Sequence, residues 1–331
     1  MRPRRQFIAL LGGAALAWPL DVGAQQVVGK TARIGLLQTS PDNPVVQFGY
    51  PVFVEELKKY GFVEGKNLTI EKVRTDQDSK RLFAETSDLA RSNVDLLVIA
   101  GGPEIALQAA MGTSQTIPIV ILATNYDPIA HGYVKSLARP GGNITGIVSR
   151  QTELAAKKVE LLTQAFPDRT RLAVFYDGIS ADQFDAAQRQ AELLRLEVRS
   201  LKLEHPPYDF DAAFHSLAEG SPQMLLVLSS EFFTRYRSHI AELAIQQRLP
   251  TMFMFRWYVE AGGLMSYGTD IRAGYRKLAY YVSKILNGAK PADVPVEEAE
   301  KFELVINLKT AKAIGVDPST SILLRADEVI E

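Results

Sequence analysis

Short, unbroken apolar runs recur along the chain, and they constrain its fold more than any other feature. Each run has the length of a strand but lacks the alternation of a strand with one solvated face. A segment with helical spacing separates each run from the next. Buried strands separated by helices are typical of parallel sheets that are covered on both faces. The clearest runs are RIGLLQ (33–38), DLLVIA (95–100), PIVILA (118–123), LAVFY (172–176) and MLLVLS (224–229).

The runs form two series, separated by the loop-rich stretch 125–146. A length of 331 residues also suits about two domains. We therefore expect an α/β fold with two doubly wound parallel-sheet lobes joined by hinge strands, with the joint near 146–149. The glycine-rich stretch 141–146 (GGNITG) predicts either a tight turn between lobes or a loop whose N–H groups face the cleft. Further strands are expected at 251–255, 263–267 and 302–307, and a long helix at 271–286.

Residues 1–24 have the three-part layout of a secretory signal. Arginines at the start precede the apolar run Phe7–Leu20, which is too short for a comfortable transmembrane span. Small residues then lead to a cleavage site expected near Ala24. The pair Arg4-Arg5 also fits a twin-arginine signal, and a Sec signal with incidental arginines is the alternative. We expect export to the periplasm.

Several classes of chemistry lack the residues that they need. The chain has no cysteine, which excludes disulfides, thiolate metal sites, cysteine nucleophiles and a lipid-modified N-terminal cysteine. Its four histidines are not spaced as a metal pair, and no nucleophile elbow or H-E-x-x-H motif occurs. A net charge of -1 argues against nucleic-acid binding. We expect no catalytic residues, no metal, no cofactor and no nucleic-acid partner.

Residues that directly follow strands are the candidate ligand site, because doubly wound sheets bind ligands beyond the carboxyl ends of their strands. The segments there, among them Ser229-Ser230-Glu231, mix hydroxyls, amides, carboxylates, one arginine and aromatic rings. That mixture suits a small polar or zwitterionic organic ligand. For any single residue, capping, turn formation or rim packing is the structural alternative. The predicted ligand-binding residues are Gln38, Thr39, Ser40, Gly102, Asn125, Tyr126, Asp127, Thr145, Tyr176, Asp177, Ser229, Arg256, Trp257 and Tyr267.

Three kinds of contact are expected among these residues. Arg256 is expected to hold a carboxylate through two hydrogen bonds. Asp127 or Asp177 is expected to take an ammonium group. Tyr126 or Trp257 is expected to stack on a ring or to cover a cation.

Long segments also carry a family resemblance. They are RRQFIALLGGAALAWPL (4–20), LKKYGFVEGKNLTIE (57–71), TIPIVILATNYDPIAHGYVKSLARPGGNITGI (116–147), YVEAGGLMSYGTD (258–270), ILNGAKPADVPVEEAEKFELVINLKTAKAIGV (285–316) and LLRADEVIE (323–331). In these segments the chain resembles the periplasmic substrate-binding proteins of ABC importers that are grouped with tryptophan/tyrosine-type binding proteins. Two departures stand out: Asn125-Tyr126 precede the Asp-Pro motif, and the segment after the first strand lacks the run associated with tryptophan-type members. Tryptophan specificity is therefore not carried over.

The resemblance implies a type I periplasmic-binding fold whose two lobes are joined by three hinge strands. It places 30–147 and 266–300 in the first lobe, and 148–265 and 301–331 in the second. It also implies the partners, which are a small-molecule ligand, an ABC importer permease and, through it, the ATPase.

We therefore expect a monomeric, non-enzymatic, exported solute-binding subunit. Its ligand is expected to be amino-acid-like or an aromatic carboxylate, with a branched or aliphatic carboxylate as the alternative. Two other functions remain open from the sequence: a ligand-sensing module for a membrane receptor, and an exported α/β hydrolase.

Overall fold

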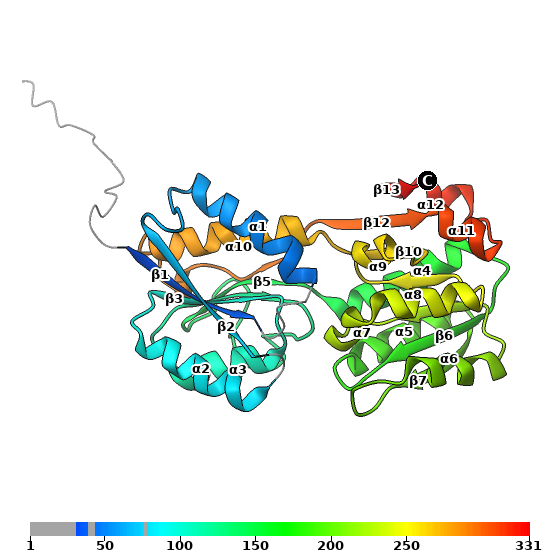
Figure 1. Cartoon of the computed structure of the whole chain (residues 1–331), viewed down its shortest axis with the longest axis horizontal. Coiled ribbons are helices and arrows are strands. Elements are labelled where there is room, and N and C mark those ends of the chain that lie inside the picture. The colour runs from blue at the N-terminus through cyan, green and yellow to red at the C-terminus, as the bar shows by residue number, and fades with distance from the viewer. Residues whose placement is uncertain (1–30, 39–43, 76–77) are drawn as a thin grey trace, which may run out of the picture. The chain divides into compact units, whose positions relative to one another are not determined.

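The computed structural model describes residues 31–38, 44–75 and 78–331. The secretory signal expected at 1–24 and the candidate residues Thr39 and Ser40 lie outside these ranges. Thr31–Glu331 is one compact unit, and it contains two separate sheets (Figure 1).

The first sheet is entirely parallel. Its strand order is β11-β5-β4-β3-β1-β2. The strands are β1 (Ala32–Gln38), β2 (Leu68–Arg74), β3 (Leu96–Ala100), β4 (Ile119–Ala123), β5 (Ile144–Val148) and β11 (Glu297–Glu298).

Helices cover both faces of this sheet. On one face lie α1 (Pro44–Lys59) and α10 (Ile271–Leu286); on the other lie α2 (Ser79–Arg91) and α3 (Glu104–Thr113). Successive strand residues enter different cores: Val98 packs with α1 and α10, whereas Ile99 packs with α2 and α3. Burial on both faces explains why these strands are uniformly apolar, as predicted.

The second sheet has the order β13-β12-β10-β9-β8-β6-β7. It is parallel except that β12 runs antiparallel to β10. The strands are β6 (Arg171–Tyr176), β7 (Glu197–Lys202), β8 (Met224–Val227), β9 (Thr251–Phe253), β10 (Met265–Thr269), β12 (Phe302–Asn307) and β13 (Glu328–Ile330).

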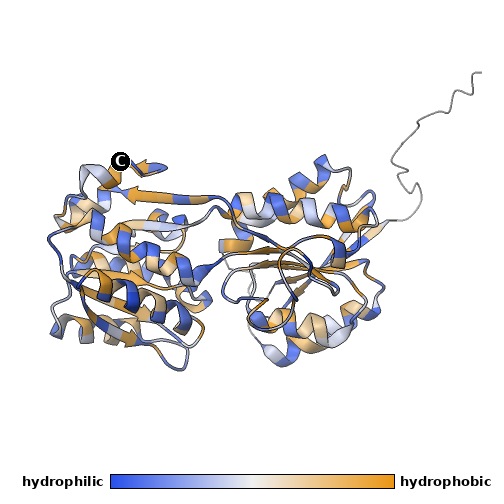
Figure 2. Ribbon diagram, turned by 180° about the vertical axis from the view of Figure 1, so that it is seen from behind, coloured by the Kyte–Doolittle hydropathy of each residue, from blue (hydrophilic) through white to orange (hydrophobic). Residues whose placement is uncertain are grey.

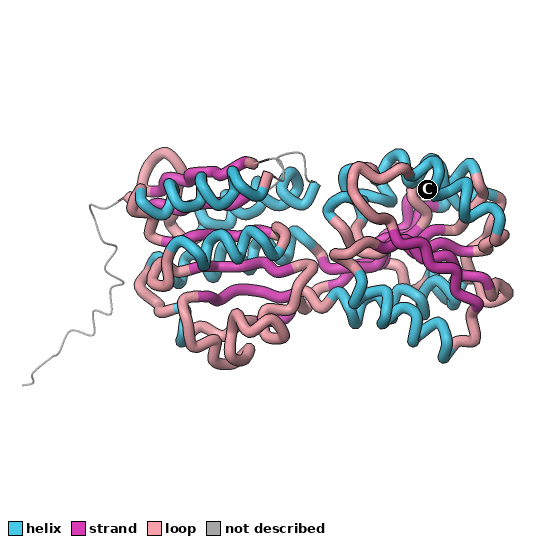
Figure 3. The backbone as a smooth tube through the Cα atoms, turned by 90° about the horizontal axis from the view of Figure 1, so that it is seen from below, coloured by secondary structure: helices cyan, strands magenta, loops and turns pink. Residues whose placement is uncertain are grey.

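Helices also lie on both faces of the second sheet, as Figure 3 shows. One face packs against α4 (Gln151–Ala165) and α5 (Ala181–Leu193), and the other against α6 (Phe210–Glu219) and α8 (Arg237–Gln246). The strands of both sheets are mostly orange in Figure 2, in keeping with their buried positions. The shorter elements are α7 (Glu231–Arg235), α9 (Arg256–Glu260), η1 (Pro291–Asp293), α11 (Leu308–Ile314) and α12 (Thr320–Leu323).

Within the described ranges, the chain passes between the sheets three times: after β5, after β10 and after β11. The crossings brace one another through backbone hydrogen bonds. The amide of Ala299 donates to the carbonyl of Val148 at 2.9 Å, and the amide of Asp270 donates to the carbonyl of Lys301 at 2.9 Å. Arg150 adds an ion pair to Glu298 across two of the crossings.

Two boundaries differ from those drawn from the sequence. The family resemblance places residues 266–269 in the first lobe, but β10 pairs with β9 and β12 and so belongs to the second sheet. The strand expected at 251–255 ends at Phe253, and Phe255 is the N-cap of α9. In both places tertiary pairing, rather than the local apolar pattern, sets the boundary.

Gly146 lies inside β5 and not in a turn between lobes. Its φ is 139°, and a Cβ placed on it would stand 2.1 Å from the carbonyl oxygen of Ile121 on β4. The glycine therefore permits a close approach of two paired strands.

Candidate functional site

Both sheets reverse their winding at equivalent places. In the first sheet β2 lies on one side of β1, and β3 and the later strands lie on the other side. In the second sheet β7 and β8 flank β6 in the same way. Such a switch point leaves a crevice outside the carboxyl ends of the strands. A cavity of about 860 Å³ is lined by segments that follow β3 and β4 of the first sheet and β6 and β8 of the second. Its described lining is Ser79, Leu82, Gly101, Pro103, Glu104, Ile105, Asn125, Tyr126, Asp127, Ala130, His131, Thr152, Gly178, Ile179, Ala181, Asp182, Glu231 and Phe232.

Three of the predicted residues, Asn125, Tyr126 and Asp127, reach this cavity together from the end of β4. Asp127 shapes the turn that follows, because its Oδ1 accepts hydrogen bonds from the amides of Ile129 at 2.8 Å and Ala130 at 3.1 Å. Tyr126 is 6% exposed, and its hydroxyl has no hydrogen-bond partner among the described residues. Burial raises the pKa of Tyr126, with a smaller contribution from Glu104, so the phenol stays neutral.

Glu104, in the first turn of α3, anchors a small polar cluster on the cavity wall. Its Oε1 lies 2.6 Å from Nδ1 of His131 and accepts a hydrogen bond from the hydroxyl of Tyr133. Burial opposes ionisation of Glu104, but these hydrogen bonds outweigh it and lower the pKa of the carboxyl. Glu104 is therefore an anion whose charge is already shared with two neighbours.

On the second lobe, Asp177 organises the loop after β6. The carboxylate is fully buried. Its Oδ1 accepts from the amides of Ile179 at 3.0 Å and Ser180 at 3.1 Å, and from the hydroxyl of Ser180 at 2.9 Å. Its Oδ2 accepts from the hydroxyls of Tyr208 at 3.1 Å and Ser230. The structure thus uses Asp177 as a scaffold for the loop, and Asp177 itself does not line the cavity.

Ser230 links this scaffold to Glu231. Ser230 is the N-cap of α7, and its hydroxyl oxygen accepts from the amide of Phe232 at 3.2 Å while donating to Asp177. Glu231 follows at once and lines the cavity. Its Oε2 is buried and has no hydrogen-bond donor in the described part of the chain. Burial, assisted by the charge of Asp177, raises the pKa of Glu231 to about 7.

A hydrogen bond joins the strand ends of the two sheets beside the cavity. The hydroxyl of Ser229 donates to Oδ1 of Asn125. Ser229 is held from behind by Gln183, whose Oε1 accepts from the Ser229 amide at 3.0 Å and whose Nε2 donates to its carbonyl at 3.3 Å. Both partners of the bond were predicted ligand-binding residues.

Arg256 forms ion pairs with three carboxylates. Its guanidinium pairs with Glu260 at 2.9 Å, Glu303 at 3.2 Å and Glu328 at 2.8 Å, which connects α9 to β12 and β13. It is not among the described lining residues of the cavity. Glu303 and Glu328 lie 47 and 72 residues further along the chain, so local sequence gives no sign of this arrangement.

Trp257 makes a second contact between the lobes. Its ring stacks on Phe48 of α1, with centroids 6.1 Å apart and planes 6° apart. The indole is 3% exposed, and its Nε1 finds no acceptor within the described ranges. Trp257 is therefore packed between elements rather than displayed on the cavity wall.

The remaining candidates occupy separate places. Thr145 donates to the carbonyl of Val294 at 2.8 Å, Tyr176 stacks on Phe184 at 4.2 Å, and Tyr267 stacks on Phe302 at 6.1 Å. Gln38 is buried at the end of β1, and Gly102 follows β3; neither is among the described lining residues.

Sequence reasoning missed several lining residues, and some had a signal. Glu231 follows a strand in the segment Ser229-Ser230-Glu231, of which only Ser229 is among the predicted ligand-binding residues. Glu104 and Asp182 stand in first helical turns, where an acidic residue is usually explained by the helix dipole. His131, which the sequence offered only as one of four histidines not spaced as a metal pair, is bonded to Glu104.

In the ranges that the structure describes, no cluster of three or more histidine, aspartate or glutamate side chains is arranged to hold a metal ion. Among the described helices, none has the length and apolar character needed to cross a membrane.

Comparison with known proteins gives consistent matches. Residues 46–330 match the family model described as ABC transporter substrate binding protein. A tyrosine-binding protein of Clostridioides difficile (strain R20291) is 25% identical over 294 residues, which cover 87% of this chain and 82% of that protein.

Two solved structures are similar across the fold. A conserved domain protein from Vibrio cholerae has a TM-score of 0.82 at 25% identity, over 91% of this chain and 100% of that one. A Streptococcus pneumoniae ABC domain in complex with L-Trp has a TM-score of 0.80 at 24% identity, with the same coverage.

Proposed function

The chain belongs to the family of ABC transporter substrate-binding proteins, and on that premise we propose that it captures a small organic ligand between its two lobes for delivery to a membrane permease. One observation carries the proposal. Residues from both sheets line a single cavity of about 860 Å³ at the carboxyl ends of their strands. A volume of this size accommodates a ligand of amino-acid dimensions.

The mechanism is a shift in populations, and no bond of the ligand is broken. A ligand that touches both lobes stabilises the arrangement in which both contact it, by the free energy of the contacts made only there. The three crossings are short and are hydrogen-bonded to one another, so they can bend as a hinge and still keep the two lobes aligned. The Ser229–Asn125 hydrogen bond already joins the two lobes beside the cavity.

The ligand class follows from the lining and from the relatives. The cavity has aromatic side chains at Tyr126 and Phe232 and carboxylates on both lobes. The Clostridioides relative is named for tyrosine, and the Streptococcus structure contains L-Trp. We infer an amino-acid-like or aromatic ligand for this chain. The N-terminal segment supports capture outside the cytoplasm, with the permease and its ATPase as partners.

A ligand screen on the mature chain tests the proposal. The chain starting at Gln25 is mixed with single amino acids, aromatic acids and aromatic amines, and its melting temperature is recorded. A true ligand raises the melting temperature with the logarithm of its concentration above the dissociation constant. Scattering at small angles with and without each hit then measures compaction. Hits that never compact the protein, or a screen with no hit, would contradict the proposal.

A further inference from the structure

Phe48 and Trp257 join the two lobes at a place outside the cavity. Phe48 stands on α1 of the first lobe and Trp257 on α9 of the second, and their rings stack with centroids 6.1 Å apart and planes 6° apart. Neither residue belongs to the described lining of the cavity. The pair therefore connects the lobes without occupying the place of a ligand.

The stacked pair adds to a larger apolar contact. A single cluster of buried apolar side chains contains Val45 and Phe53 of α1 together with Phe255 and Trp257 of the second lobe. The ring of Phe255 also lies against Trp257, with centroids 4.2 Å apart. Apolar packing is thus continuous from one lobe to the other, and Phe48 extends it through Trp257.

Separating the lobes at this place brings water to apolar surface. Trp257 is 3% exposed, and an arrangement that moves α1 away from α9 removes its stacking with Phe48. The Ser229–Asn125 hydrogen bond opposes separation less, because water can replace either partner when the bond breaks. Of these two contacts, the aromatic pair therefore contributes more to holding the lobes together.

A contact of this kind changes ligand affinity from outside the cavity. A ligand that needs both lobes binds the closed arrangement, in which both lobes line the cavity. Its apparent dissociation constant is the intrinsic value divided by the fraction of free protein that is already closed. A contact that raises this fraction tightens the binding of every ligand by the same factor, whatever the chemistry of the ligand.

We propose that Phe48 and Trp257 form a latch that stabilises the closed arrangement and so helps to set how tightly the protein holds any ligand. This inference rests on the proposed function and adds two affinity-determining residues that do not touch the ligand. An aromatic pair contributes enough free energy to change an equilibrium constant roughly 2- to 10-fold. Loss of the latch should lower the closed-to-open ratio by that factor.

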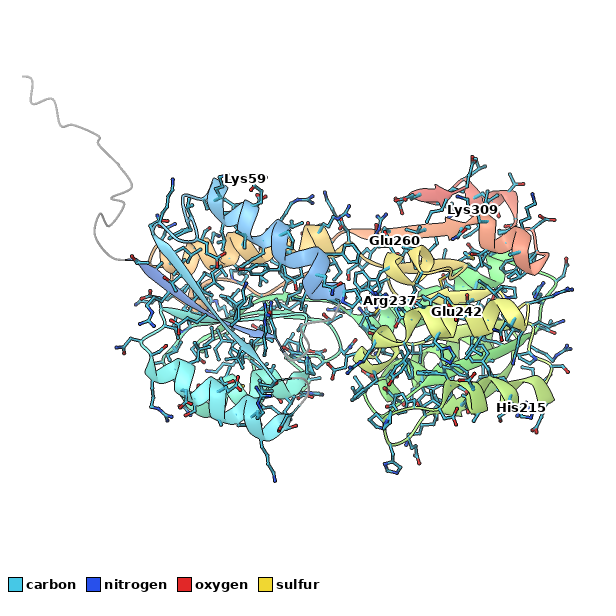
Figure 4. The ribbon with its side chains drawn as sticks, viewed as in Figure 1. Lys59, His215, Arg237, Glu242, Glu260 and Lys309 are labelled. Carbon is cyan, nitrogen blue, oxygen red and sulfur yellow. The ribbon has the colours of Figure 1, made fainter. Side chains whose placement is uncertain are left out.

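Distances between spin labels test the latch without any ligand. The chain has no cysteine, so Lys59→Cys and Glu242→Cys create two unique labelling sites. Lys59 is exposed on α1 of the first lobe, and Glu242 is exposed on α8 of the second and absent from the described cavity lining (Figure 4). Pulsed electron paramagnetic resonance on the ligand-free mature chain measures the closed and open populations. Phe48→Ala should lower their ratio roughly 2- to 10-fold.

Two further variants make the comparison specific. Phe83→Ala is the matched control, since Phe83 is 41% exposed on α2, which covers the opposite face of the first sheet from α1. It should leave the closed-to-open ratio unchanged. Phe48→Leu keeps an apolar side chain but removes the ring, and it should shift the ratio in the same direction by a smaller factor. Melting curves establish that each variant is folded.

The fluorescence of Trp257 reports on the same contact. The sequence has two tryptophans, and the other, Trp18, lies in the segment expected to be removed on export. In the mature chain, selective excitation of tryptophan therefore reads Trp257 alone. A ligand without an indole ring that compacts the protein should also shield Trp257 from quenching by acrylamide. Compaction that leaves this quenching unchanged would mean that the pair does not lie at the moving contact, and the inference would be wrong.

Affinity provides a third measurement. Titration calorimetry with L-tyrosine, L-phenylalanine and L-tryptophan compares wild type with Phe48→Ala. Each compound that binds wild type should bind the variant more weakly by one common factor, equal to the ratio of the two closed fractions obtained from the spin labels. Affinities that fall by unequal factors would place Phe48 in contact with the ligand and overturn the inference.

The outcomes distinguish the latch from the function beneath it. If folded Phe48→Ala has the same closed-to-open ratio as wild type, or if Phe83→Ala shifts the ratio equally, the inference is wrong and the proposed function stands. If no compound of the wider screen binds, the proposed function is rejected. The spin-label distances then still decide whether Phe48 and Trp257 hold the lobes together.

Discussion

The Ser229 hydroxyl donates to the Asn125 side-chain oxygen across 104 residues of sequence, and this bond ties the end of one sheet to the end of the other. Both residues stand just beyond a strand, and Asn125 lines the cavity. A ligand that contacts both lobes would therefore bind next to a hydrogen bond that already joins them.

A double-mutant cycle measures this bond. Ser229→Ala and Asn125→Ala should each lower the free energy of unfolding, and the double variant should lose about 1 kcal/mol less than the two single losses combined, because both remove one bond. Urea denaturation of the four proteins gives the coupling. Losses that simply add would show that the two side chains do not stabilise each other in solution.

The pKa of Glu231, raised from 4.5 to about 7, makes stability depend on pH. A carboxyl with a raised pKa in the folded protein holds its proton better than in the unfolded chain. Its favourable contribution is complete below pH 4.5 and is lost as the pH rises through 7. Wild type should therefore lose up to about 3 kcal/mol between pH 4.5 and 8 that Glu231→Gln does not lose.

Urea denaturation at pH 5 and pH 8 checks this difference, with Glu242→Gln as the control. Glu104, Asp127, His131 and Asp182 in the cavity lining are common to all three proteins. Asp177 and Tyr208 interact with the charge of Glu231, so any change in them belongs to the measured difference. Parallel pH profiles for wild type and Glu231→Gln would contradict the assignment.

Gly146 should tolerate no side chain. Gly146→Ala places a methyl group against the backbone of β4, 2.1 Å from an oxygen that cannot move without breaking the sheet. We expect a loss of at least about 2 kcal/mol in the free energy of unfolding, or failure to fold. Gly142→Ala is the control, because a Cβ there meets nothing within 4 Å among the described residues. Equal effects of the two changes would refute this account.

Lys158 is a buried lysine whose amino group has no compensating partner in the described structure. It lies in the middle of α4 with no exposure. Burial lowers its pKa from 10.5 to about 7. Stability therefore rises with pH between 7 and 10.5, and the full cost of burying the charge applies below pH 7.

Lys158→Met keeps the volume and removes the charge. We expect it to stabilise the protein by up to about 5 kcal/mol at pH 6, with the gain shrinking by about 1.4 kcal/mol per pH unit above 7. Thermal or urea unfolding at pH 6, 7.5 and 9 measures the gain. A destabilised variant at every pH would mean that the lysine has a structural partner.

Arg256 should matter for stability and not for ligand affinity. Arg256→Ala leaves Glu303 and Glu328 side by side without their cation, and we expect a loss of about 1–3 kcal/mol in the free energy of unfolding. Ligand affinity, measured by calorimetry on the folded variant, should be unchanged. A carboxylate ligand that binds much more weakly to this variant would restore the role in ligand binding expected from the sequence.

Most of the fold could be predicted from local patterns of apolar residues in the sequence. The apolar runs at 33–38, 95–100 and 118–123 became β1, β3 and β4, because a strand buried on both faces must be apolar throughout. The placement of β10 could not be read in the same way, since GLMSY has the same apolar character whichever sheet it joins. Its position depends on pairing with β12, more than 30 residues further along the chain.

The site was predictable where position along a strand decided it. Asn125, Tyr126 and Asp127 reach the cavity because they follow β4, and that rule needs only the sequence. Arg256 obeys the same rule but is neutralised by glutamates from β12 and β13. Asp177 is likewise satisfied by hydroxyls from Tyr208 and Ser230. Whether a charged side chain is available to a ligand depends on partners that only the folded chain brings together.

The crossings between the sheets also govern the order in which the protein is completed. A ribosome delivers all the strands from β1 to β5 before the second lobe begins, but α10 and β11 arrive only after β10. Until then one face of the first sheet lacks Leu278, Ala279 and Val282, which bury its apolar side chains. The half of the molecule that is synthesised first must therefore wait for the other half before its core can close.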